Sequence, residues 1–212
     1  MTPQLLIFDL DGTLIDSRAD LATAVNLMRQ HFGLPALPLA TITTFVGDGV
    51  RALVTRALQG TSVNVEEAAR VQAPLYREHL FDETTLYPGV SDVLNRLHQA
   101  GHTLALATNK PVDASETILA HFGLRSLFAK VLGGGSTARL KPHPEALETI
   151  MAGTGFGAKD TWMVGDNHTD LECARRAGAR SVFCAFGFGN RRAETPTVTI
   201  QSFGELAGLF LT

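Results

Sequence analysis

The sequence predicts an α/β protein in which a doubly wound parallel sheet is interrupted, near its start, by an all-helical insertion. From residue 86 onwards, short apolar segments alternate with segments of helical spacing, the pattern of parallel strands joined by helical crossovers. Between residues 16 and 85, by contrast, the apolar spacing is helical and no segment resembles a strand. We therefore expect a core domain formed by residues 1–15 and 86–212, and an inserted helical domain formed by residues 16–85.

The first strand is expected at Leu5–Phe8, a bulky apolar run of the kind found in strands buried on both faces. The insertion is then predicted to contain helices at residues 21–31, 49–58 and 65–80. Gly33 is a candidate C′ residue for the first of these helices, and Asn64 is a candidate N-cap for the third. Pro74 falls inside the third pattern, and we expect it to kink or split that helix.

The rest of the core is predicted to alternate between strands and helices. Strands are expected at residues 102–107, 130–132, 161–164 and 181–185, and helices at residues 90–100, 112–122, 144–152, 171–177 and 203–210. Gly101, Gly123 and Gly178 each follow one of these helices, as expected for residues that end a helix. In a doubly wound sheet, ligands bind at the carboxyl ends of the strands, so the residues that follow the strands are the candidate site.

The composition is that of an ordinary globular protein. The 212 residues are 45% hydrophobic and 18% charged, with a formal net charge of −3, which gives no indication of binding to nucleic acid or to an anionic membrane. No apolar stretch approaches the roughly 20 residues needed to span a bilayer, and no secretory signal is recognisable. Cys173 and Cys184 lack a Cys-x-x-Cys spacing and are expected to be reduced. We expect a cytoplasmic protein, and the sequence predicts no oligomeric state.

The segment that directly follows the first strand has the most specific chemistry. Asp9 and Asp11 lie two residues apart, and such crowded carboxylates repel each other unless a cation or a shared proton compensates. Gly12 and Thr13 then turn the chain and offer backbone N–H groups and a hydroxyl to an anion. Carboxylates, a hard cation and an anion site in one turn indicate phosphoryl transfer. An Asx-turn without a catalytic role is the structural alternative.

Polar residues also follow the later strands. Thr108 and Asn109 follow the strand that ends at residue 107, and Asp166 follows the strand that ends at residue 164. Lys141 precedes a proline just ahead of a helix. These side chains can converge with Asp9 at one edge of the sheet. As alternatives, Thr108 with Asn109 and Asp166 could be helix N-caps, and Lys141 could be solvated.

Taken in order, these segments resemble the motifs of the haloacid dehalogenase (HAD) superfamily. The matching segments are Asp9-Leu10-Asp11-Gly12-Thr13, Thr108-Asn109, Lys141-Pro142 and Gly165-Asp166 with Asp170. The resemblance implies a Rossmann-like core, and it implies that the insertion is the superfamily's helical C1-type cap. It further implies a Mg²⁺-dependent phosphatase that acts on a small-molecule phosphate ester through an aspartyl-phosphate intermediate.

The resemblance also implies roles for individual residues. Asp9 would be the nucleophile, and Asp11 would protonate the leaving alkoxide and then activate water. Lys141 would pair with Asp9 and with the phosphoryl oxygens, stabilising negative charge in the transition state. Thr108 and the amide that follows it, that of Asn109, would bind the phosphoryl group.

The same resemblance implies a metal site. Mg²⁺ would be held by Asp9, by the backbone carbonyl of Asp11 and by Asp166, with water and a phosphate oxygen as further ligands. Asp170 either binds the metal through a water molecule or contacts the metal ligands without binding the metal itself. We favour the second role.

The substrate is expected to be set by the segment Phe45–Val54 of the insertion. Gly47 and Gly49 leave amides open to an anion near the start of a helix, and Arg51, one turn in, could bind a carboxylate. As the alternative, the glycines only permit the turn and Arg51 is a surface side chain. This segment, with residues 9–17 and 86–90, resembles bacterial phosphoglycolate phosphatases, which implies 2-phosphoglycolate as the substrate.

Three positions depart from that family. Asp48 stands where the family often has Asn, and Gly135 stands where it usually has an acidic residue. The segment Phe186–Asn190 is also shorter than the family's usual run. Three alternatives to a phosphoglycolate phosphatase therefore stay open: a phosphatase for a sugar phosphate or pyrophosphate, a phosphomutase, and an interaction protein without activity.

Overall fold

Six parallel strands form the central sheet, in the order β5-β4-β1-β6-β7-β8. A computed structural model gives the structure of the protein and describes residues 2–211. The strands are β1 (Leu5–Phe8), β4 (Thr103–Pro111), β5 (Phe128–Gly134), β6 (Thr161–Gly165), β7 (Arg180–Cys184) and β8 (Val198–Ile200). The chain runs outward from β1 to β5 on one side and from β6 to β8 on the other, which confirms the predicted doubly wound sheet.

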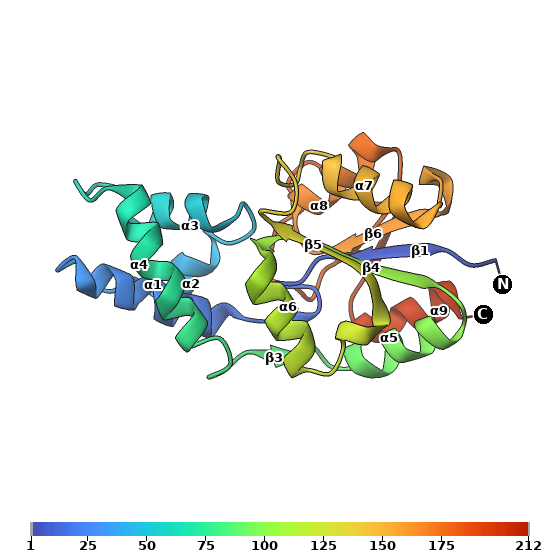
Figure 1. The fold of residues 1–212 in the computed structure, drawn as a ribbon, viewed down its shortest axis with the longest axis horizontal. Helices are drawn as coiled ribbons and strands as arrows, with labels where there is room; N and C mark the ends of the chain where they lie inside the picture. Colours follow the sequence, from blue (N-terminus) through green and yellow to red (C-terminus); the bar gives the residue numbers. More distant parts are fainter. Residues whose placement is uncertain (1, 212) are drawn as a thin grey trace.

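Helices cover both faces of this sheet (Figure 1). They are α5 (Val90–Gln99), α6 (Val112–His121) and α9 (Leu206–Phe210) on one face, and α7 (Glu145–Thr154) and α8 (His168–Ala177) on the other. The alternation of β1 explains this arrangement, because successive side chains of a strand point to opposite faces. Leu6 and Phe8 pack in the hydrophobic cluster with α5, α6 and α9, whereas Leu5 and Ile7 pack in the cluster with α7 and α8.

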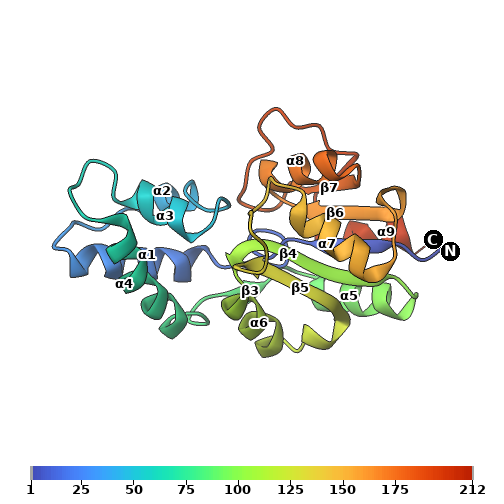
Figure 2. The same ribbon diagram turned by 45° about the horizontal axis from the view of Figure 1, so that its top comes forward.

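Four helices form a block to one side of the sheet (Figures 1 and 2). These cap helices are α1 (Arg18–His31), α2 (Leu39–Thr43), α3 (Val50–Ala57) and α4 (Val65–Glu78). A two-stranded antiparallel ribbon of β2 (Ile15–Asp16) and β3 (Thr85–Leu86) joins the segments that enter and leave the block. The exact domain limits, at residues 15/16 and 85/86, stay a prediction.

A buried carboxylate fastens the two connections of the block together. Asp20, in the first turn of α1, accepts hydrogen bonds from the backbone N–H of Glu83 at 2.9 Å and of Thr84 at 2.8 Å. The hydroxyl of Thr84 also donates to Asp20, at 2.6 Å. These bonds hold the segment that leaves the cap helices, just before β3, beside the start of α1. They therefore help to fix the position of the cap helices relative to the edge of the sheet.

The structure differs from the predicted elements in a few places. Helix α4 continues through Pro74, which lies on its exposed side, and Asn64 caps this helix as predicted by accepting from the N–H of Glu67. Strand β4 extends to Pro111, beyond the predicted end at residue 107, because its last residue pairs with Gly134 of β5. Helix α2 and strands β2, β3 and β8 were not predicted, since each is too short to show a period.

Three 3₁₀ turns complete the elements: Arg125–Leu127, Ala158–Asp160 and Phe203–Glu205. The last of these replaces the first turn of the predicted terminal helix, which begins as an α-helix only at Leu206. Within residues 2–211, no helix is long and apolar enough to cross a bilayer.

Candidate active site

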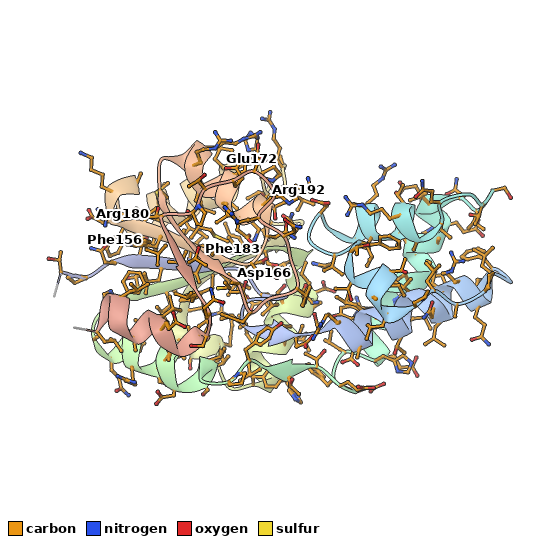
Figure 3. The ribbon with its side chains drawn as sticks, turned by 180° about the vertical axis from the view of Figure 1, so that it is seen from behind. Phe156, Asp166, Glu172, Arg180, Phe183 and Arg192 are labelled. Atoms are coloured by element: carbon orange, nitrogen blue, oxygen red, sulfur yellow. The ribbon has the colours of Figure 1, made fainter. Side chains whose placement is uncertain are left out.

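A cleft lies where the carboxyl ends of β1, β4 and β6 face the cap helices. Side chains and backbone from both parts line it: Asp9, Asp11, Leu21, Val46, Gly47, Gly49, Val50, Leu53, Gln72, Tyr76, Thr108, Asn109, Lys110, Pro111, Asp166, Asn167 and Phe188. Figure 3 shows Asp166 on the side of the core that faces the cap helices. The cleft is therefore at the switch point of the sheet, where a ligand is expected in this fold.

Three buried carboxylates meet at the base of the cleft. Oxygen atoms of Asp9, Asp166 and Asp170 lie within 4.8 Å of one another. Burial raises the pKa of Asp166 well above its ordinary value, and the nearby carboxylates of Asp170 and Asp9 raise it further. Oδ1 of Asp9 lies 3.0 Å from the ammonium of Lys141 but makes no hydrogen bond to residues 2–211, so it can still offer a lone pair to a ligand. These oxygens suit a hard cation, which would relieve the repulsion between the carboxylates.

Lys141 is enclosed by this cluster. Its ammonium donates to Oδ1 of Asp170 and to the carbonyl of Ala107, both at 2.6 Å, and lies 3.0 Å from Oδ1 of Asp9 in an ion pair. Burial opposes the charge of Lys141, but the carboxylates of Asp170 and Asp9 outweigh it and raise the pKa of the lysine. The predicted pair between Lys141 and Asp9 is thus present, and the alternative of a solvated lysine is excluded.

Asp170 is committed to neighbouring protein groups. One oxygen accepts from Lys141, and the other accepts from the backbone N–H of Asn167 at 3.0 Å. That second bond is half of a capping box at the start of α8, in which the side chain of Asn167 accepts from the backbone N–H of Thr169. With both oxygens used in this way, Asp170 is suited to hold Lys141 in place.

The turn after β1 differs from its prediction. The N–H of Gly12 donates to the carbonyl of Ile15 at 2.9 Å, and that of Thr13 donates to Leu10 at 3.2 Å. Thr13 is fully buried, neither residue lines the cleft and both amides are bonded within the turn, so anion binding by these residues stays a prediction that this arrangement does not support. Gly12 has another role, because a Cβ at this position would overlap the carboxylate of Asp166.

Asp11 has two partners that the sequence analysis did not assign. The ammonium of Lys110 donates to Oδ1 of Asp11 at 2.8 Å and to Oδ2 at 3.1 Å, and the hydroxyl of Ser17 donates to Oδ1 at 2.5 Å. The only sequence signal for Lys110 was its position directly after Thr108 and Asn109, at the end of a strand.

Thr108 and Asn109 have different surroundings. Thr108 lines the cleft as predicted, and its hydroxyl has only a long contact, 3.3 Å, with the N–H of Lys110. Asn109 instead uses its side-chain amide between two loops: it donates to the carbonyls of Gly47 and Lys141, both at 2.9 Å, and accepts from the N–H of Lys141 at 2.8 Å. Its side chain therefore joins the core to the cap, and only its backbone is available for the predicted phosphate contact.

The residues predicted to select the substrate are only partly at the cleft. Gly47 lines it, and a Cβ on Gly47 would lie 2.5 Å from the side-chain nitrogen of Asn167, so the cap loop (residues 46–49) packs closely on the core. Arg51 does not line it: its side chain is 77% exposed and pairs with Glu66 at 2.7 Å. The surface alternative for Arg51 is therefore correct in this arrangement. Gly135 is also outside the cleft lining.

A second loop, residues 186–190, covers Asp166 from the core side. The N–H of Gly189 donates to Oδ2 of Asp166 at 2.7 Å, and Phe188 lines the cleft. A Cβ on Gly187 would overlap the carboxylate of Asp166 and the carbonyl of Gly12. The backbone of this loop can approach the carboxylate only because the residue there is glycine.

Comparisons with known proteins agree with this arrangement. The family model of haloacid dehalogenase-like hydrolases matches residues 6–184. The phosphoglycolate phosphatase of Aliivibrio fischeri is 38% identical over 195 residues, which are 88% of this chain and 86% of that protein. That of Chromobacterium violaceum is 37% identical, over 95% of this chain and 94% of that protein.

Among solved structures, a predicted phosphoglycolate phosphatase from Haemophilus somnus superimposes with a TM-score of 0.93. It is 30% identical to this chain, and the match covers 99% of each. The doubly wound sheet, the paired aspartates after β1 and the full-length similarity all lead to one assignment. The chain belongs to the haloacid dehalogenase-like hydrolase family, and within it to the phosphatases related to phosphoglycolate phosphatase.

Proposed function

We propose that this enzyme hydrolyses 2-phosphoglycolate to glycolate and phosphate, with Mg²⁺ as its metal. The observation that carries the proposal is the position of Asp9 and Asp11 in one cleft, with Lys141 beside the first and Lys110 beside the second. Relatives named phosphoglycolate phosphatase, matching nearly the whole chain, support the choice of substrate.

The reaction requires a nucleophile and a proton donor on opposite sides of the phosphorus. A carboxylate oxygen of Asp9 forms a bond to phosphorus while the bond to the glycolate oxygen breaks, and that oxygen takes a proton from Asp11. Water then attacks the phosphorus of the aspartyl phosphate and gives its proton to Asp11, which releases phosphate and restores both residues. The hydrogen bonds from Ser17 and Lys110 orient Asp11 for both steps.

Lys141 and the metal counter the negative charge of the substrate. Asp9, Asp166 and the backbone carbonyl of Asp11 would hold Mg²⁺, which would supply positive charge to offset the repulsion between the phosphoryl group and the nucleophile. Asp170 keeps the ammonium of Lys141 beside Asp9. Thr108 lines the cleft with a hydroxyl that is free to donate to a phosphoryl oxygen. The cytoplasmic location stays a prediction.

The test is phosphate release from 2-phosphoglycolate beside sugar phosphates, pyrophosphate and ethyl phosphate, each with and without Mg²⁺. We expect a preference for 2-phosphoglycolate and a loss of turnover when the metal is chelated. A higher kcat/KM with a sugar phosphate or pyrophosphate would contradict the substrate. Transfer of phosphate to a second substrate position, without its release, would identify a phosphomutase.

A further inference from the structure

The side of the cleft away from the carboxylate cluster contains three polar side chains that the reaction above does not require for bond breaking. Lys110 comes from β4 of the core, and Gln72 and Tyr76 come from α4 of the cap. Among the described residues that line the cleft, Lys110 is the one cation. Gln72 and Tyr76 are four residues apart and therefore project from the same face of the helix.

Lys110 is a buried cation at the boundary between the two parts. Its side chain is 2% exposed, and its ammonium contacts Asp11 at 2.8 Å and the hydroxyl of Tyr76 at 2.5 Å. Burial opposes its charge, but Asp11 and Tyr76 outweigh the burial and raise the pKa of Lys110, so the lysine is cationic at neutral pH. An ammonium has three N–H donors, and here they are directed at Oδ1 and Oδ2 of Asp11 and at the hydroxyl of Tyr76, so a ligand carboxylate in the cleft would attract Lys110 by its charge and would share one of these donors.

Tyr76 offers a second donor. Its oxygen accepts the hydrogen bond from Lys110, so its own O–H is left to donate elsewhere. Burial raises the pKa of Tyr76 to about 12, which keeps the phenol protonated at neutral pH. The ammonium of Lys110 also lies 4.5 Å from the centre of the Tyr76 ring, so the two groups are held together.

Gln72 offers a third donor and currently has no partner. It is 2% exposed and lines the cleft, yet its side-chain amide makes no hydrogen bond to any residue from 2 to 211. The amide oxygen and nitrogen of Gln72 are not among the fully buried polar atoms without a partner, so they keep contact with the open space of the cleft, where a polar ligand can bind them. The residue type at this position is therefore explained most simply by a polar ligand.

We propose that Lys110, Tyr76 and Gln72 form a subsite that binds the carboxylate of the leaving group, so that the enzyme selects phosphate esters of short hydroxy acids. This inference rests on the proposed function. In 2-phosphoglycolate one carbon separates the leaving oxygen from the carboxylate. A leaving oxygen placed to take a proton from Asp11 therefore brings its carboxylate next to Lys110, the neighbour of Asp11. Arg51, exposed and paired with Glu66, takes no part.

The test compares 2-phosphoglycolate with ethyl phosphate, in which a methyl group replaces the carboxylate. The quantity measured is the acid preference, the ratio of kcat/KM for the two esters, in the wild type and in Lys110→Met, Gln72→Leu and Tyr76→Phe. We expect the preference to fall about tenfold to a hundredfold in Lys110→Met and about threefold to tenfold in the other two. The ratio is used because Lys110 also contacts Asp11, and its loss lowers the rates with both esters.

Arg51→Met is the matched control, since it removes an exposed cation from the same cap and should leave the acid preference within about twofold of the wild type. If Lys110→Met does not fold, Gln72→Leu and Tyr76→Phe still decide the question. A wild type without acid preference would overturn the proposed function. A wild type with acid preference that all three variants retain would overturn the subsite alone, as would a loss of preference in Arg51→Met equal to that in Gln72→Leu.

Discussion

The two walls of the cleft are built differently. On the core side, charged groups are bound to one another: Lys141 touches both Asp9 and Asp170, and Asp166 accepts from the backbone of Gly189. On the cap side, the buried Gln72 makes no side-chain hydrogen bond to any of residues 2–211. Under the proposed roles, the groups that break bonds are therefore positioned before any substrate arrives, whereas Gln72 of the cap wall would gain its partner only from a ligand.

Asn109 is one of the direct links between these walls, beside the hydrogen bond from Lys110 to Tyr76. Its side-chain amide hydrogen-bonds to Gly47 in the cap loop and to Lys141 in the core. One side chain therefore fixes the position of the cap loop relative to the core. Around it, the cap loop contacts the core mainly through close packing at Asn167. Substitutions in one wall can therefore be compared with substitutions in the other.

Asp9→Asn should have the largest effect on the core wall. The amide is not a nucleophile, so kcat should fall by about 10⁴-fold or more while the fold is retained. The measurement is phosphate release at saturating substrate, with thermal unfolding as the check on folding. A variant that turns over at a rate near that of the wild type would remove Asp9 from the reaction.

Lys141→Met should affect both activity and stability. Methionine has a similar length, but it leaves the carboxylates of Asp9 and Asp170 buried without their cation. Breaking such a pair costs about 3–5 kcal/mol of unfolding free energy, measurable by urea unfolding without added metal. Lys159→Met, at a residue with no recorded charge partner in the described chain, is the control and should change stability by less than about 0.5 kcal/mol. Equal stabilities of the two variants would contradict the buried ion pair.

Asn109→Ala should weaken the link between the walls. The variant loses the bonds to Gly47 and Lys141, and we expect kcat/KM to fall by about tenfold to a hundredfold. Asn95→Ala is the matched control, because Asn95 is exposed and bonds only within its own helix, to Ser91. The idea fails if both variants have the same kcat/KM.

Gly187→Ala should disturb the metal site, and with it the turn after β1, because the added Cβ would also lie 2.3 Å from the carbonyl oxygen of Gly12. The added Cβ would overlap the Asp166 carboxylate, which must shift to make room. We expect the Mg²⁺ concentration for half-maximal activity to rise about tenfold, since a displaced carboxylate is a poorer ligand. Gly157→Ala, where no heavy atom lies within 4 Å of the added Cβ, should leave that concentration unchanged. An unchanged midpoint in Gly187→Ala would argue against Asp166 as a ligand.

Most of the residues that form the core wall could be predicted from the sequence, whereas those that form the cap wall could not. Asp9, Thr108, Lys141 and Asp166 were predicted to converge, and they do, because the carboxyl ends of parallel strands meet at one edge. Arg51 was misplaced because glycines before a helix do not reveal which side of that helix faces the core. Gln72 was missed because nothing local distinguishes an unpartnered buried amide from an exposed one.

The turn at Gly12 shows a second limit of the sequence. Its amides were expected to bind an anion, but they bond within the turn, and the glycine instead makes room for Asp166, a residue more than 150 positions away. Lys110 illustrates the same limit, because its partners Asp11 and Tyr76 lie far away in the chain. Roles that depend on such distant contacts become visible only in the folded structure.

Under the proposed roles, the phosphoryl group is assigned to the core wall and the carboxylate of the substrate to the cap wall. The most direct test of this assignment is the acid preference in one variant from each wall. Thr108→Val removes a core hydroxyl that lines the cleft and is proposed to bind the phosphoryl group, and Gln72→Leu removes the cap amide that has no hydrogen-bond partner among residues 2–211. We predict that Thr108→Val lowers kcat/KM for 2-phosphoglycolate and ethyl phosphate equally, whereas Gln72→Leu lowers mainly the first. Equal losses on both esters in Gln72→Leu, or a changed preference in Thr108→Val, would contradict the account.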